Sequence, residues 1–137
     1  MITKILLFAL VIVLVAAVVW VRIAPSTPEY WHRDPVGLAD PRRPNFARVD
    51  RIVALSPQAT RSAIDDAAQA DGAQVLAGGD DFTTWMVRTL IMGFPDYISV
   101  RLIPVGGGTR IVALSRSRFG YGDLGVNRAR LNRWLPN

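Results

Sequence analysis

The chain has 137 residues, half of them hydrophobic, and a net charge of +5 that comes from fifteen arginines and one lysine. It has no cysteine, which excludes disulfides, thiolate metal sites and cysteine nucleophiles. Its single histidine, His32, excludes a histidine cluster around a metal ion and leaves a serine nucleophile without a histidine base in the domain. The composition therefore predicts neither a metal nor a cofactor.

Residues 1–23 are predicted to form a transmembrane signal anchor. No charge lies between Lys4 and Arg22, and the run is almost wholly apolar. At about 1.5 Å per residue, it reaches the short end of what crosses roughly 30 Å of hydrocarbon. A cleaved signal peptide is the alternative. The apolar run exceeds the usual length of about 7–15 residues, and the bulky residues 18–21 form a poor cleavage site, which favours the anchor.

The charges around this segment give two opposing indications of its orientation. Counting basic residues favours a cytoplasmic domain, because Arg22, Arg33 and Arg42 follow the span within about 20 residues. In contrast, a short positive tail before such a segment stays inside, and long domains cross largely regardless of charge. We expect a single-pass inner-membrane protein with a periplasmic domain.

Residues 24–45 form a linker that contains five of the nine prolines. Such a segment is extended and semi-rigid. Tyr30 and Trp31 lie within it, near the membrane, where amphipathic aromatic rings are favourable. Two interpretations stay open at this point: a spacer that lies over its own domain, or a strap that docks on a neighbouring membrane protein through Tyr30 and Trp31.

Residues 46–137 are expected to form an α+β domain, in which a small antiparallel sheet carries two helices on one face. The Ser56-Pro57 pair predicts a helix start, and Gly72 predicts its end. Pro95-Asp96 predicts a turn. Alternating apolar residues and turn signals predict the remaining elements, which are strands over residues 49–55, 73–76, 82–94, 97–105 and 109–118, and a final helix over residues 127–135.

A glycine-rich turn joins the last strand to the last helix. The spacing of Gly120, Gly122 and Gly125 matches the dinucleotide fingerprint, but the 12 residues that follow hold neither the parallel strand nor the acidic residue that the fingerprint needs. Backbone N–H groups at the helix start could still hold an anion. The candidates for this site are Arg118, Gly120, Gly122, Arg128 and Arg130. The alternative is that Asp123 caps the helix and pairs with an arginine.

Arg88 lies in an apolar strand and therefore needs a partner or access to the rim of the sheet. Asp96 and Asp123 are the candidate partners for a structural ion pair. An anion pocket of Arg88, Arg101 and Arg118 is the alternative. A hydrolase that uses the carboxylates of Asp96 and Asp123 is a further interpretation, but no other catalytic constellation is evident.

Residues 117–130 read S-R-F-G-Y-G-D-L-G-V-N-R-A-R. This run resembles the C-terminal signature of the domain of unknown function 1499 family, whose pattern is roughly R-S-x-S-R-x-G-x-x-D-x-G-x-N-R-x-R. The segment Gly93-Phe94-Pro95-Asp96 is similar to the family's G-F-V-D-D, and the match covers about residues 37–135. The resemblance implies membrane-associated or lumenal placement without an agreed activity.

Two departures from the family pattern concern one acid and one base. Tyr97 stands where the family's second aspartate would be, and Leu114 stands at its first arginine. We hypothesise that relatives form a cross-strand ion pair here, which this chain replaces by an apolar contact; such exchanges are often neutral for stability. The hypothesis requires both side chains on one face of the sheet.

These observations favour a non-enzymatic accessory or assembly subunit of a larger inner-membrane complex, with respiratory and photosynthetic complexes as the candidates. The alternative is a module that binds an anionic lipid or a small anion through the arginine-rich C-terminal turn and helix. The expected partners are the lipid bilayer, a larger membrane protein complex and an anionic lipid. Nucleic acid is not expected, because the tethered chain has no recognised binding motif.

Overall fold

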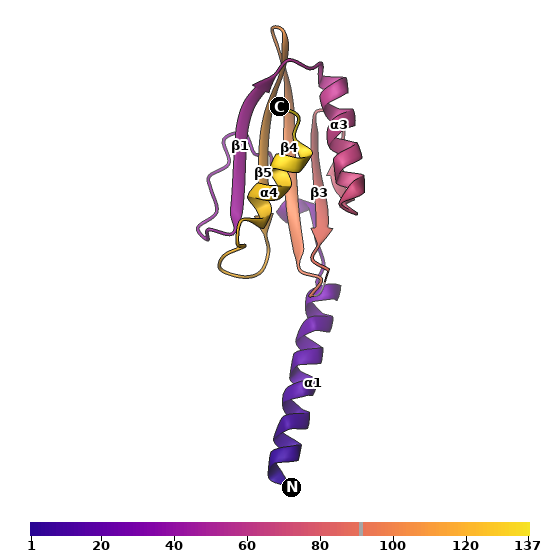
Figure 1. Cartoon of the computed structure of the whole chain (residues 1–137), viewed down its shortest axis with the longest axis vertical. Helices are drawn as coiled ribbons and strands as arrows, with labels where there is room; N and C mark the ends of the chain where they lie inside the picture. The colour runs from indigo at the N-terminus through magenta and orange to yellow at the C-terminus, as the bar shows by residue number, and fades with distance from the viewer. Residues whose placement is uncertain (91) are drawn as a thin grey trace.

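The computed structural model describes residues 1–90 and 92–137. The domain is an α+β fold around one antiparallel sheet with strand order β1-β5-β4-β3-β2 (Figure 1). The predicted fold class and the order of the elements are confirmed. The elements are α1 (Ile2–Ile23), α2 (Pro28–Trp31), β1 (Phe46–Val53), α3 (Pro57–Ala70), β2 (Gln74–Gly78), β3 (Phe82–Arg88), β4 (Pro95–Val105), β5 (Gly108–Ser117) and α4 (Val126–Trp134).

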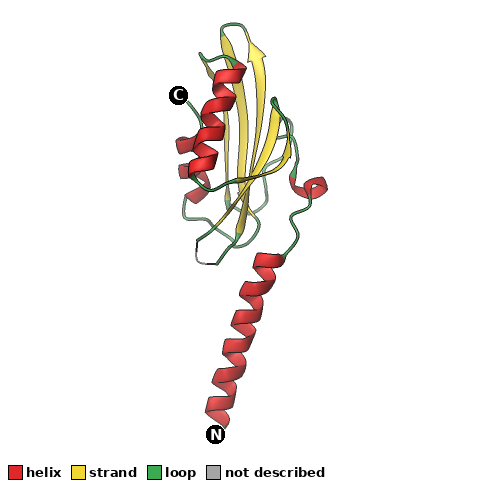
Figure 2. Cartoon of the chain, turned by 90° about the vertical axis from the view of Figure 1, so that its right-hand side faces the viewer, coloured by secondary structure: helices red, strands yellow, loops and turns green. Residues whose placement is uncertain are grey.

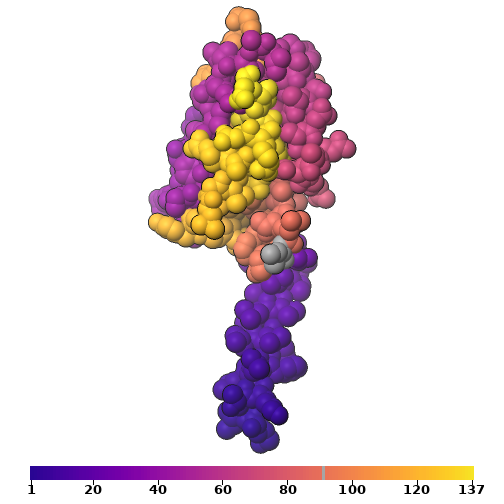
Figure 3. Space-filling model, viewed as in Figure 1, coloured from indigo at the N-terminus to yellow at the C-terminus, as the bar shows by residue number. Residues whose placement is uncertain are grey.

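Helices α3 and α4 cover one face of the sheet, and the core lies between these two layers (Figures 2 and 3). Helix α3 begins as its sequence predicts, with Pro57 in the first turn and the Ser56 hydroxyl accepting a hydrogen bond from the amide of Ala59 at 3.2 Å. The apolar positions of α3 and α4 pack on alternate strand residues, which share a face because side chains alternate along a strand. The fully buried core side chains include Ile64, Ile98, Ile111, Leu131 and Trp134.

Residues 24–45, which we call the strap, lie across the opposite face of the same sheet (Figure 2). The Trp31 ring stacks on the Tyr97 ring with centroids 3.9 Å apart and an interplanar angle of 11°. The His32 ring stacks on Phe82 at 4.0 Å. Tyr97 is fully buried beneath this layer. The strap therefore follows the spacer interpretation: Trp31 is engaged by its own domain, whereas Tyr30 remains 67% exposed.

The attachment of the strap is expected to weaken as pH falls. His32 Nδ1 lies 2.9 Å from Thr84 Oγ1. Burial lowers the pKa of His32 from its ordinary value of 6.5, and the charge of Arg101 lowers it further, while Asp34 opposes both. His32 binds a proton less well when the strap is attached to the sheet than when it is free. The stabilisation of the attached strap by neutral His32 is therefore complete above pH 6.5 and is lost as pH falls through that value.

Limited proteolysis with a protease active at both pH values would measure this effect. We expect faster strap cleavage at pH 5.5 than at pH 7.5, and a smaller pH difference in His32→Gln, whose side chain does not titrate in this range. An equal pH dependence in the variant would assign the effect to other groups.

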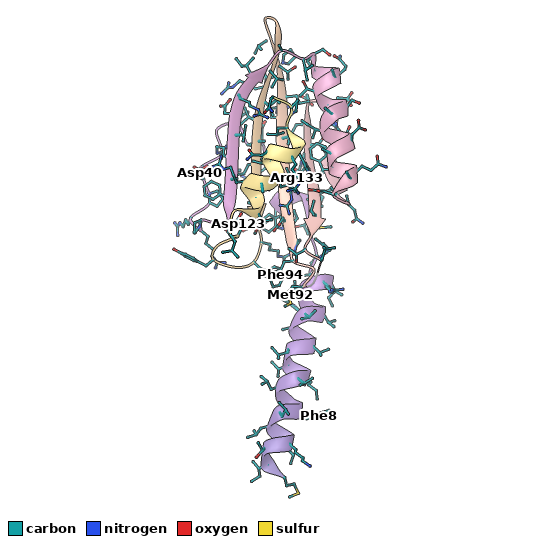
Figure 4. All side chains as sticks on the ribbon, in the orientation of Figure 1. Phe8, Asp40, Met92, Phe94, Asp123 and Arg133 are labelled. Carbon is teal, nitrogen blue, oxygen red and sulfur yellow. The ribbon has the colours of Figure 1, made fainter. Side chains whose placement is uncertain are left out.

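Helix α1 is 22 residues long, spans about 33 Å, and is apolar enough to cross a membrane. None of its most apolar window is buried inside the structure, and Phe8 projects outward from it (Figure 4). Only its C-terminal end meets the domain, where Val21 and Ala24 are buried and Trp20 approaches Phe119. The exposed apolar surface of α1 is thus the part that a bilayer would cover.

The turn between β3 and β4 does not lie at the position predicted from the sequence. Pro95 and Asp96 lie in β4 rather than in a turn, because a proline is tolerated as the first residue of a strand. The strand expected over residues 82–94 ends at Arg88, and residue 91 lies outside the described residues. The chain turns where the amide of Thr89 donates to the carbonyl of Phe94 and Gly93 adopts a φ of +70°.

Tyr97 and Leu114 lie on one face of the sheet. The register pairs Tyr97 with Arg116 and Ser99 with Leu114, so the two residues are diagonal neighbours on adjacent strands. The ion-pair hypothesis requires both side chains on one face of the sheet, and the structure meets this requirement. The two positions are not directly opposite each other.

Candidate functional site

The C-terminal signature is organised around Asn127, which is fully buried at the start of α4. Its side-chain amide donates to the carbonyl of Asn45 at 3.1 Å and to the hydroxyl of Ser117 at 2.9 Å, and its side-chain oxygen accepts from the hydroxyl of Ser115. Asn45 in turn donates to the carbonyl of Gly120 at 2.9 Å. One asparagine thus links the end of the strap, β5 and α4.

Arg130 and Asp96 form an ion pair of 2.9 Å inside the domain, with 5% and 2% of their surfaces exposed. This pairing differs from the one expected for Asp96. The register places Asp96 opposite Val87, so that Arg88 projects from the other face of the sheet. Arg88 instead donates to the carbonyl of Gly93.

The turn before α4 does not form the anion site expected there. Both carboxylate oxygens of Asp123 accept backbone N–H groups, one from Gly125 at 3.1 Å and one from Asn127 at 2.9 Å. Burial opposes its charge, but the hydrogen bonds from Asn127 and Gly125 hold the pKa of Asp123 below the usual 3.8. The chain's own carboxylate thus occupies the position that an anion would take. No ion pair of Asp123 with an arginine is found in the described part of the chain.

The arginines predicted for this site are also separated from one another. Arg130 is buried in its ion pair, Arg128 is exposed on α4, and Arg118 follows β5 and donates to the carbonyl of Pro25 at 2.9 Å. Gly120 turns its carbonyl toward the side chain of Asn45, and a side chain added to Gly122 would meet no neighbour within 4 Å. The candidate arginines are close in sequence, but the fold places them on different sides of the sheet.

The structure does not form the two alternative sites either, namely the anion pocket around Arg88 and the pair of catalytic carboxylates. Arg101 forms ion pairs with Asp34 and Asp81, so it does not meet Arg88 and Arg118 in one pocket. The carboxylates of Asp96 and Asp123 are engaged by Arg130 and by backbone amides, which leaves neither free to act as a general base.

A different basic site lies between the strap and the end of β5. The hollow has a volume of about 440 Å³, and its wall includes Tyr30 and Trp31. The strap contributes Arg33, Arg42 and Arg43, and the other side contributes Arg116 and Arg118. We call this site the arginine groove.

Arg116 is the most constrained member of the arginine groove. Its guanidinium lies 5.1 Å from the centroid of the Trp31 ring and donates from Nη2 to the Trp31 carbonyl at 2.9 Å. Its Nε is buried and has no hydrogen-bond partner. Burial lowers the pKa of Arg116, and the neighbouring charge of Arg33 lowers it further. The site therefore holds a half-buried cation whose charge its surroundings disfavour.

No carboxylate compensates the arginine groove. Within residues 1–90 and 92–137, the ion pairs involve six other arginines and none of these five. Asp34 and Asp40, which flank the groove in sequence, bind Arg101 and Arg48 instead. A cluster of guanidiniums without an internal acid is suited to bind an anion, because guanidinium groups recognise carboxylate and phosphate oxygens in pairs.

Of the five groove arginines, only Arg118 is a site candidate predicted from the sequence. Arg33, Arg42 and Arg43 lie in a proline-rich segment that gave no periodic signal, and their approach to β5 spans more than 70 positions in sequence. The nearest signal was the placement of Arg116 and Arg118 on one strand face, opposite the face that carries Ser115 and Ser117.

The family comparison covers the strap as well as the domain. No curated protein and no solved structure matches the chain. The model of the family described as "Protein of unknown function (DUF1499)" matches residues 26–137, a span that contains the buried Asn127 network, the Arg130–Asp96 pair and the arginine groove. The chain therefore belongs to the DUF1499 family.

Proposed function

We propose that this protein is a membrane-anchored binding module whose arginine groove holds an anionic group, either a phosphate or a carboxylate. The observation that carries the proposal is Arg116, a half-buried arginine with an unpartnered Nε and no ion pair within the described residues. Leaving a cation in such surroundings costs free energy, and an anion in the groove would recover it.

The second support is the surplus of positive charge in one hollow. Five guanidiniums line about 440 Å³, whereas six other arginines of the described chain pair with carboxylates. Among the described residues, the hydrogen bonds of Arg43 and Arg118 go to carbonyl oxygens, and no ion pair compensates their charges. This arrangement favours a ligand with two or more negative oxygens over a neutral one.

The proposed location is the inner membrane, with α1 as a single anchor and the domain on the periplasmic side. The length and apolar composition of α1 support the anchor. The groove lies in the part of the domain that adjoins the end of α1, since Tyr30, Trp31, Arg43 and Arg118 also line a hollow that reaches Trp20. A ligand in the groove would thus be held close to the membrane surface.

Inorganic phosphate is the simplest probe of the proposal. In the full-length protein in a nonionic detergent, phosphate is expected to raise the Tm with increasing concentration, because a ligand that binds only the folded state stabilises it. Sodium chloride at equal ionic strength serves as the salt control. Arg116→Gln is expected to weaken phosphate binding about tenfold or more, since it removes a half-buried charge from the wall of the groove.

Arg128→Gln is the matched control variant. It removes the same charge from an exposed position on α4, outside the groove, and is expected to keep the phosphate response of the wild type. An equal loss in both variants would reduce the effect to net charge and contradict a specific site. Wild-type protein with no response beyond that to sodium chloride would also contradict it.

The accessory-subunit function remains a second proposal. Of the two candidate residues for contact with a partner, Trp31 is stacked on Tyr97, and Tyr30 stays largely exposed. Tyr30 is therefore the candidate that we keep for this function. Purification of the tagged protein from its native membrane in mild detergent tests it. A stoichiometric membrane complex that depends on Tyr30 would support this function, and a protein that purifies alone would contradict it.

A further inference from the structure

A second hollow of about 620 Å³ adjoins the arginine groove. The two hollows share four residues of their walls: Tyr30, Trp31, Arg43 and Arg118. The second hollow continues from these shared residues toward the C-terminal end of α1, where Trp20 and Phe119 complete its wall together with Pro25 and Thr27.

The chemistry of the wall changes along this path. The groove is basic, whereas the end near α1 is aromatic. The Trp20 and Phe119 rings meet edge to face at 6.1 Å, and Phe94 lies 5.5 Å from Phe119. Arg118 lies at the transition, with its guanidinium 5.3 Å from the Phe119 centroid. A ligand that fills both hollows would need an anionic end and an apolar end.

The surface at this end of the domain also favours contact with lipid. The loops that carry Met92 and Asp123 lie at the end of the domain nearest α1 (Figure 4). Leu90 and Leu124 are almost fully exposed there, and Tyr121 is 76% exposed. Large apolar side chains on loops beside an apolar helix are suited to the interface between headgroups and acyl chains, where Trp20 would also lie.

We propose that the anion bound by the arginine groove is the head of a membrane amphiphile, whose acyl chain leaves through the second hollow along Trp20 and Phe119. This inference rests on the proposed function, because it identifies the ligand of the same groove. The group that the groove would bind is a phosphate, and the amphiphile that carries it comes from the bilayer in which α1 would lie. The protein would thus hold single lipid molecules by head and chain together.

Two probes that share one head separate this inference from the proposed function. Glycerol 3-phosphate carries the head alone, and lysophosphatidic acid adds one acyl chain. Binding of each to the full-length protein in nonionic detergent is measured by titration calorimetry. We expect lysophosphatidic acid to bind at least about tenfold more tightly than glycerol 3-phosphate.

Variants of the second hollow then show whether the added affinity comes from the protein or from the micelle. Phe119→Ala and Trp20→Leu are expected to reduce the gain from the acyl chain and to leave glycerol 3-phosphate binding unchanged. Trp20→Leu keeps α1 apolar, so it serves where Phe119→Ala perturbs the fold. Phe8→Ala, on the part of α1 far from the hollow, is the matched control and is expected to keep the full gain.

The outcomes are distinguishable. A gain that is equal in wild type, Trp20→Leu and Phe119→Ala would assign it to the micelle and overturn the inference. Equal binding of the two probes by the wild type would overturn it as well, while the anion-binding function would stand. Failure of the wild type to bind either probe would overturn the proposed function itself.

Discussion

Replacement of Arg130 by methionine is expected to lower the free energy of unfolding by about 3–5 kcal/mol, the usual cost of breaking a buried ion pair from one side. Asp96 is only 2% exposed, and its ion pair is with Arg130 at 2.9 Å. The variant would leave a carboxylate that is buried and unpaired. Urea denaturation followed by tryptophan fluorescence reports this loss, because Trp85 lies in the core against Trp134 of α4.

The same helix offers a matched control. Arg128→Met removes an equal charge two residues earlier, from an exposed position, and is expected to change stability by no more than about 0.5 kcal/mol. The double variant Arg130→Met with Asp96→Leu is expected to recover much of the loss, since it removes both charges together. Similar losses in Arg128→Met and Arg130→Met would show that net charge, rather than the buried pair, sets the stability.

The buried Arg130–Asp96 pair is part of a larger set of contacts made by the C-terminal signature. Asn127 ties together Asn45, Ser115 and Ser117, and Asp123 caps the start of the helix that carries Arg130. Apart from the buried Nε of Arg130, which has no hydrogen-bond partner among the described residues, these groups engage one another inside the domain. These contacts join the last strand, the turn and the last helix, whereas Arg118, which also belongs to the signature, lines the arginine groove.

Local signals in the sequence predicted most of the fold. The Ser56-Pro57 start of α3 follows from a side-chain cap, and the glycine turn between β4 and β5 follows from the backbone conformations that glycine allows; the structure has both. The misplaced turn at Pro95 shows the limit of such signals. Whether a proline starts a strand or a turn depends on which neighbour pairs with it, and here Pro95 lies opposite Arg88.

The arginine groove could not be predicted by the same means. It depends on a strap that folds back over the sheet, and one of the contacts that hold the strap there is the stack between Trp31 and Tyr97, which are 66 positions apart. The sequence did indicate that Arg116 faces away from Ser115, because side chains alternate along a strand. It held no local signal that Arg33 and Arg43 would meet Arg116 there.

Replacement of Trp31 by alanine is expected to lower the free energy of unfolding by about 2–3 kcal/mol, somewhat less than for a fully buried tryptophan because Trp31 is half-buried. It would uncover Tyr97 and detach the segment that carries three of the five groove arginines. Trypsin is then expected to cut the strap at Arg33 or Arg42 faster than in the wild type.

Tyr30→Ala is the control, because the neighbouring tyrosine is 67% exposed and its ring meets Trp31 nearly at right angles instead of stacking on the sheet. It is expected to cost less than about 1 kcal/mol and to leave the strap resistant to trypsin. If Trp31→Ala kept both a resistant strap and full phosphate binding, the stack would not be what assembles the groove. If it lost both, the folding of the strap and the binding of an anion would be coupled: an anion that joins Arg33 and Arg43 to Arg116 and Arg118 would itself hold the strap to the sheet.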